Sequence, residues 1–84
     1  MEERVIVVNV DPSVHCREAA NIIKANPNCT LTNLDLEEGY NNTCKTDSIM
    51  GILRIHLAKG NRCKVSGENI DSIVKILEST GELK

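Results

Sequence analysis

The sequence has almost no aromatic residues. It contains no Phe and no Trp, and Tyr40 is the one aromatic side chain among 84 residues. The core must therefore be built from aliphatic side chains, and the chain offers no aromatic platform on which single-stranded nucleic acid could stack. The net charge of −2 also lacks the basic excess that duplex binding requires. Nucleic acid is therefore not an expected partner.

Long apolar runs and closely paired cysteines are missing as well. No segment reaches the roughly 20 apolar residues of a membrane span, and the apolar run at 4–10 is too short for a signal peptide. We therefore expect a cytoplasmic protein without membrane insertion. No C-x-x-C pair occurs, so we expect no metal and name no cofactor. Three cysteines are interpreted as small buried side chains with free thiols: Cys29, Cys44 and Cys63.

The apolar pattern predicts four strands and three helices in the order β-α-β-β-α-β-α. We expect strands at 4–10, 29–36, 40–45 and 62–66, and helices that begin at Cys16, at Asp47 or Ser48, and near Ile70. In the second strand, Leu31 is out of phase with Leu34 and Leu36, which indicates a bulge. The predicted fold class is α+β. It is a two-layer open-faced β-sandwich over 1–84, a single domain whose four-stranded antiparallel sheet carries three helices on one face.

Reactive side chains gather in the segment V-H-C-R-E-A-A at 14–20, where the first helix begins. The first turn of a helix has unpaired backbone N–H groups and the positive end of the macrodipole, which together favour anions. An imidazole at His15 would be a nucleophile beside such a phosphate receptor, and Arg17 would add a charged donor. On spacing alone, an ordinary surface histidine and a solvated arginine are the commoner explanation.

Two motifs in this order resemble the HPr family, the histidine phosphocarrier proteins of the bacterial sugar phosphotransferase system. The first is V-H-C-R-E-A-A, and the second is D-S-I-M-G-I-L-R-I-H-L-A-K-G at 47–60. The second motif is similar to the S-I-M-G…A-K-G segment of HPr proteins from Gram-positive bacteria. The resemblance covers almost the whole chain.

The resemblance implies roles for individual residues. His15 corresponds to the histidine that Enzyme I phosphorylates at Nδ1 with phosphate from phosphoenolpyruvate, and Arg17 to the arginine that supports this phosphate. Ser48 corresponds to the serine modified by HPr kinase/phosphorylase, although its local sequence indicates a plain helix N-cap equally well. The surface implied for docking Enzyme I and sugar-specific EIIA-type acceptor domains contains Ile49, Met50, Leu53 and Ala20.

The resemblance further implies a monomeric carrier in place of a free-standing enzyme, with a catabolite-control transcription regulator as a further partner. Several residues depart from the family pattern. Glu18 replaces Pro, Ser13 replaces Gly and Asp47 replaces Lys. The two acidic residues leave open a regulatory paralogue with little phosphotransfer, since each is an anion near a phosphate. Cys16 leaves open a thiol-based sensor. His56 has no partner motif and is interpreted as structural.

Overall fold

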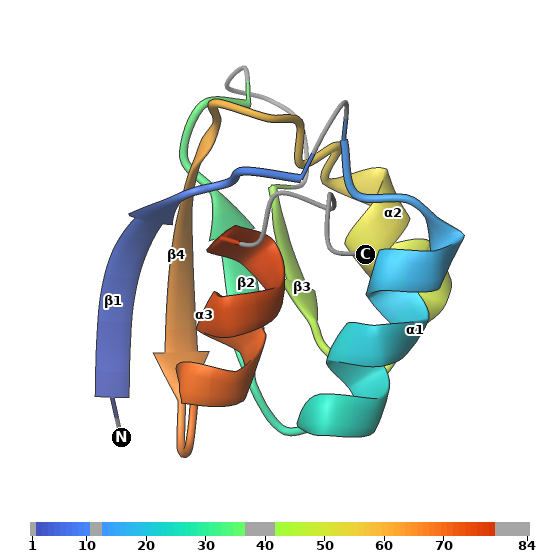
Figure 1. Ribbon diagram of the computed structural model, residues 1–84, viewed down its shortest axis with the longest axis vertical. Helices are drawn as coiled ribbons and strands as arrows, with labels where there is room; N and C mark the ends of the chain where they lie inside the picture. Colours follow the sequence, from blue (N-terminus) through green and yellow to red (C-terminus); the bar gives the residue numbers. More distant parts are fainter. Residues whose placement is uncertain (1, 11–12, 37–41, 79–84) are drawn as a thin grey trace.

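The computed structural model describes residues 2–10, 13–36 and 42–78. Seven elements follow one another in the predicted order (Figure 1). They are β1 (Glu2–Val7), α1 (Cys16–Ala25), β2 (Thr30–Asn33), β3 (Thr43–Lys45), α2 (Ile49–Arg54), β4 (Arg62–Gly67) and α3 (Asp71–Glu78).

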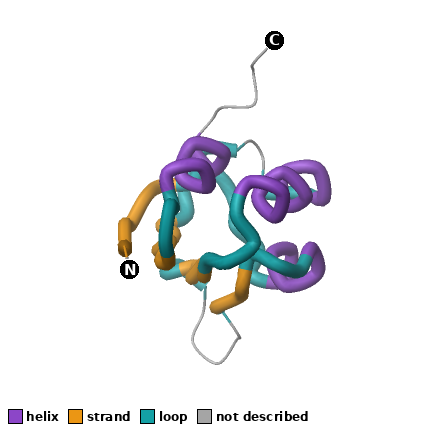
Figure 2. The backbone as a smooth tube through the Cα atoms, turned by 90° about the horizontal axis from the view of Figure 1, so that it is seen from below, coloured by secondary structure: helices purple, strands orange, loops and turns teal. Residues whose placement is uncertain are grey.

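The four strands form one antiparallel sheet in the order β1-β4-β2-β3. Figure 2 separates the helices from the strands, and all three helices lie over the same face of the sheet. The open-faced sandwich predicted from the sequence is thus confirmed.

Alternation along the strands decides which side chains reach the core. In β1, Ile6 is buried while Val5 and Val7 are exposed on the open face. In β4, the buried positions are Cys63 and Val65, because successive side chains of a strand point to opposite faces. The core is aliphatic apart from cysteine, and the three cysteines predicted to be buried all lie in it.

The second strand corrects the prediction in both length and phase. β2 has four residues, and its pairing with β4 runs without interruption, so the expected bulge is absent. Leu31 and Asn33 are the inward-facing positions, whereas Leu34 lies in the turn that follows. A polar inward position is stable here because the Asn33 side-chain amide donates to the carbonyl of Ile55 at 2.7 Å.

The other boundaries differ from the prediction by a few residues. β1 occupies Glu2–Val7 because β4 pairs with it over that range, and 8–10 leave the sheet with Val8 and Val10 still buried. Of the predicted strand 40–45, Tyr40 lies outside the described residues. Within the part of the chain that the structure describes, no helix has the length and apolar character needed to span a membrane.

Candidate functional site

His15 is the N-cap of α1, and its side chain is exposed. Its backbone is extended, and its carbonyl accepts the first helical hydrogen bond from the Ala19 N–H at 2.9 Å. The amides of Cys16 and Arg17 precede that bond, so they have no acceptor within the helix. The imidazole therefore stands beside unpaired N–H groups at the positive end of the helix dipole.

Glu18 lies in the first turn of α1 and bonds back to the residue that begins the helix. Its carboxylate accepts a hydrogen bond from the backbone N–H of His15 at 3.0 Å, which is the glutamate half of a capping box. The carboxylate is thus bound to the backbone of the histidine. Among the described residues, no ion pair joins Glu18 to Arg17, whose side chain is exposed. The guanidinium can therefore turn toward an anion at His15.

Ser13 fixes the orientation of the imidazole. The Ser13 Oγ lies 3.1 Å from the His15 Nε2. When this hydroxyl accepts from Nε2–H, the ring is in the tautomer whose lone pair lies on Nδ1. Ser13 is itself anchored by an antiparallel bridge to Ala58. The histidine is therefore oriented by a segment that is tied to the body of the protein.

An open pocket lies next to His15. Its walls are Ser13, Val14, His15, Leu53, His56 and Ala58. The pocket brings a second histidine to the site, which the sequence analysis interpreted as structural. No local pattern could have indicated His56, because it reaches the pocket through the pairing of two segments more than 40 positions apart in the chain.

Ser48 is the N-cap of α2, so the structure selects it over Asp47, the other candidate from the sequence. Its Oγ accepts a hydrogen bond from the Gly51 N–H at 3.2 Å, and the residue is exposed. A modifying enzyme can therefore reach the hydroxyl, which also holds the first turn of α2. Asp47 precedes it and is exposed too.

An apolar surface begins at the first turn of α2. Met50 is 74% exposed and Ile49 is 38% exposed. Leu53 lies three and four positions further on, so it shares their helix face, and it also lines the His15 pocket. The exposed apolar side chains and the pocket are thus joined by one helix face. Ala20 is half-buried on α1 and lies outside the pocket walls.

The four cysteines divide by exposure. Burial raises the pKa of Cys44 to about 11 and that of Cys63 to about 12, and it also raises the pKa of Cys29. These three thiols are therefore poor nucleophiles at neutral pH. Cys16 is exposed at the first position of α1. No cluster of three or more metal-ligating side chains occurs in the described residues.

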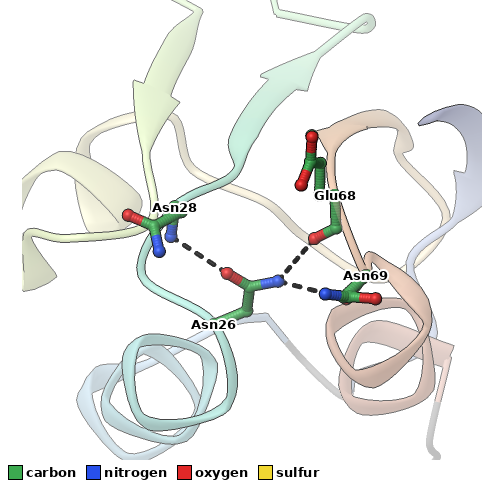
Figure 3. Close-up of a pocket in the computed structure, with 5 residues that line it drawn as sticks. Asn26, Asn28, Glu68 and Asn69 are labelled. Atoms are coloured by element: carbon green, nitrogen blue, oxygen red, sulfur yellow. Dashed lines mark hydrogen bonds between the residues drawn. The ribbon is translucent and has the colours of Figure 1, made fainter. Parts of the chain in front are cut away.

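A second pocket, at the C-terminal end of α1, is braced by one side chain (Figure 3). The Asn26 amide donates to the carbonyls of Glu68 at 2.7 Å and Asn69 at 3.1 Å, and its oxygen accepts from the Asn28 N–H at 3.1 Å. Both ends of the amide are therefore occupied in joining two loops. We therefore interpret Asn26 as a structural residue that holds these two loops together.

The chain matches no protein-family model, and it has no significant match among curated proteins. Its structure is similar to the crystal structure of HPr-C-His from Thermoanaerobacter tengcongensis. The TM-score is 0.70 at 23% sequence identity, and the match covers 100% of each chain. The protein therefore has the fold of HPr.

Proposed function

We propose that this protein is a phosphocarrier of the phosphoenolpyruvate-dependent sugar phosphotransferase system. It accepts a phosphoryl group on His15 from Enzyme I and passes it to sugar-specific EIIA-type acceptor domains. One observation carries the proposal. The exposed His15 is the N-cap residue of α1, and Ser13 Oγ lies 3.1 Å from its Nε2, which supports Nδ1 as the proposed nucleophile.

The transfer step needs little machinery. The Nδ1 lone pair of His15 forms a bond to phosphorus, while the bond from phosphorus to the donor atom breaks and leaves its electron pair on the donor. Catalysis of phosphoryl transfer consists mainly of positioning and charge stabilisation. The first-turn amides and the Arg17 guanidinium supply that stabilisation for the phosphoryl oxygens. Transfer to an acceptor is the same step in reverse.

The carrier role also accounts for the surface around the site. Specificity for a sugar would reside in the acceptor domains, and the carrier would dock them and Enzyme I through Ile49, Met50, Leu53 and Ala20. Met50 is well suited to changing partners, since its side chain is flexible and polarisable. In this proposal the protein works as a cytoplasmic monomer and is a substrate of Enzyme I.

Ser48 is proposed as a regulatory site. Phosphorylation by HPr kinase/phosphorylase would place about two negative charges beside the exposed Ile49 and Met50, and would change which partners bind there. A catabolite-control transcription regulator is the partner class implied for the modified form. Asp47 opposes this step, because it adds a like charge next to the new phosphate.

The direct test is incubation with Enzyme I and phosphoenolpyruvate. Intact-mass measurement should show one added phosphoryl group that acid removes and that heat at alkaline pH leaves in place. The His15→Ala variant is the control and should gain none. An Enzyme I that phosphorylates a known HPr but not this chain would refute the carrier function.

That negative result would favour the regulatory paralogue, for which the Glu18 carboxylate bound at the His15 N–H is the motivating observation. Binding of the unmodified protein to a partner would then carry its function. The thiol sensor is the third candidate, based on the exposed Cys16 at the start of α1. A thiol titration decides it, because a Cys16 pKa near the ordinary ~8.5 gives no reason for special reactivity.

A further inference from the structure

The two histidines of the protein line the same pocket, next to a short antiparallel contact. Ser13 bridges Ala58, and the Val14 N–H donates to the Leu57 carbonyl at 2.8 Å. His15 follows this contact in the first segment and His56 precedes it in the second, and both histidines line the one pocket.

The backbone of His56 is held in an unfavourable conformation. Its φ is +51°, in the left-handed region that costs an L-residue energy and that glycine adopts readily. The turn is held by the His56 N–H, which donates to the Leu53 carbonyl at 3.1 Å, and by Asn33, which donates to the His56 carbonyl at 3.3 Å. Strained residues that persist in a fold cluster at functional sites.

The imidazole of His56 is available for a ligand. The side chain is exposed, and it makes no hydrogen bond or ion pair with any other described residue. No hydrogen bond or ion pair of the His56 side chain with another described residue therefore offsets the cost of its left-handed backbone. The feature that glycine could not supply at this position is the imidazole, in the pocket beside His15.

We propose that His56 is a second ligand for the phosphoryl group carried by His15, and so a positioning residue for the carrier. This inference rests on the proposed function. An imidazole N–H of His56 donates to a phosphoryl oxygen, on the opposite side from Arg17 and the α1 amides. The phosphoryl group would then be held between α1 and the segment that follows α2.

The chemical consequence is slower loss of the phosphoryl group to water. In hydrolysis a water oxygen bonds to phosphorus, the P–N bond breaks, and its electron pair returns to the Nδ1 of His15. The hydrogen bond from His56 is made to the phosphoryl group while it is bound to Nδ1, and it weakens as the P–N bond lengthens and phosphorus moves toward the attacking water. His56 therefore stabilises phosphohistidine more than it stabilises the transition state of hydrolysis.

The test uses phosphoramidate, a small donor that transfers its phosphoryl group to an imidazole nitrogen with ammonia as the leaving group. Hydrolysis of phosphohistidine at His15 is followed by ³¹P NMR and site-resolved mass spectrometry. We expect His56→Gly to speed this hydrolysis about tenfold, the lower limit for losing one hydrogen bond to a charged group. His56→Gln retains a donor and should restore part of the protection.

The matched control is Asn69→Gly, which makes the same kind of change at the other non-glycine residue with positive φ in the described chain. Asn69 lies away from the His15 pocket, so its variant should hydrolyse like the wild type. The His56 ring ¹⁵N shifts should also move when His15 is phosphorylated. A merely structural role for His56 would not change those shifts.

Two results would overturn the inference. One is an unchanged hydrolysis rate in His56→Gly, and the other is a phosphoryl group found on His56 in place of His15. The experiment is independent of Enzyme I, because phosphoramidate needs no partner protein. Failure of Enzyme I to phosphorylate the chain would thus refute the proposed function alone, whereas an unaltered rate with phosphoramidate would refute the role of His56 alone.

Discussion

At the scale of the residue, the left-handed conformation of His56 has a measurable cost. Replacing His56 by glycine should raise the free energy of unfolding by about 1 kcal/mol, since glycine adopts a φ of +51° without steric conflict. Urea unfolding measures the change. Asn69→Gly should gain less, because the short polar side chain of asparagine bonds locally and so tolerates the left-handed region. A His56→Gly variant no more stable than the wild type would show that the surrounding turn bears no strain.

Glu18 has two effects that substitutions can separate. Glu18→Gln keeps an oxygen that accepts from the His15 N–H but removes the charge, whereas Glu18→Ala removes both. We expect Glu18→Ala to lose about 1 kcal/mol of stability, as for other lost caps, and Glu18→Gln to lose much less.

Transfer rates give the second readout for the Glu18 pair. Both variants should accept the phosphoryl group from Enzyme I faster than the wild type, because a carboxylate near His15 repels the dianionic phosphoryl group. Equal rates in all three proteins would show that the charge of Glu18 does not reach the phosphoryl site.

The sequence reveals His15 but cannot reveal His56. His15 stands between a strand pattern and a helix pattern, and the motif around it is local, so its position at a helix N-terminus could be predicted. His56 reaches the site because 13–14 pair with 57–58, and that register is a tertiary contact. The capping role of Glu18 was also missed, since His15 is an uncommon N-cap residue.

At the scale of the element, α2 depends on its cap. It has six residues, too few to be stable alone, and Ser48 bonds its first turn. Ser48→Ala should therefore cost about 1 kcal/mol, and Ser48→Asp should recover most of it because aspartate caps as well as serine. The matched control is Ser72→Ala on the exposed surface of α3, which should cost less than 0.5 kcal/mol, roughly a neutral surface change. Equal losses at Ser48 and Ser72 would contradict the capping role.

The turn after β2 is fastened to β4 by one carboxylate. Asp35 accepts from the Arg62 guanidinium at 2.8 Å and from the Arg62 backbone N–H at 2.6 Å. The side-chain hydrogen bond from Arg62, followed by the backbone one, lowers the pKa of Asp35 below its ordinary value. Because the folded pKa is lowered, this stabilisation is complete above the ordinary carboxyl range near pH 4 and is lost as pH falls through the lowered pKa.

The pH dependence distinguishes this bond from a surface ion pair. Asp35→Asn should unfold at lower urea than the wild type at pH 7, and the difference should shrink steadily below about pH 4. Glu3→Gln, which removes the exposed pair with Lys64, provides the comparison and should change the midpoint little. A difference between Asp35→Asn and wild type that stays constant down to the lowest pH would contradict the assignment.

Helices with a long periodic apolar pattern could be predicted from the sequence. The length and phase of a strand that depend on its pairing with other strands could not. α3 follows the spacing of Ile73, Val74 and Leu77, all of which are buried. β2 was predicted with the wrong phase, because Leu34 and Leu36 suggested an inward face that Asn33 in fact occupies. The apolar pattern cannot predict a buried amide whose partner, the Ile55 carbonyl, comes from another element.

At the scale of the whole molecule, the buried thiols limit stability in alkali. The folded pKa of Cys63 is about 12 through burial, above the ordinary thiol value. A raised pKa gives stabilisation that is complete below the unfolded pKa and falls as pH rises toward the folded one. We expect the protein to lose roughly 2 kcal/mol from this thiol between pH 7 and pH 10.

Urea unfolding at the two pH values tests this expectation. Cys63→Ala will be less stable than the wild type at both, owing to lost packing, but its decrease between pH 7 and pH 10 should be smaller. Cys16→Ala removes an exposed thiol and should show the same decrease as the wild type. An identical decrease in all three proteins would assign the alkaline loss to other groups.

The strand order has a consequence for how the chain acquires its structure. β1 has one neighbour in the sheet, β4, and the pairing joins Glu2 to Gly67 and Val7 to Arg62. During synthesis on a ribosome, β1 therefore has no pairing partner until β4, near the other end of the described chain, has been synthesised. Contacts of such high sequence separation slow folding. The exposed Val5 and Val7 lie on that unpaired strand, so β1 is open to misassociation in the nascent chain.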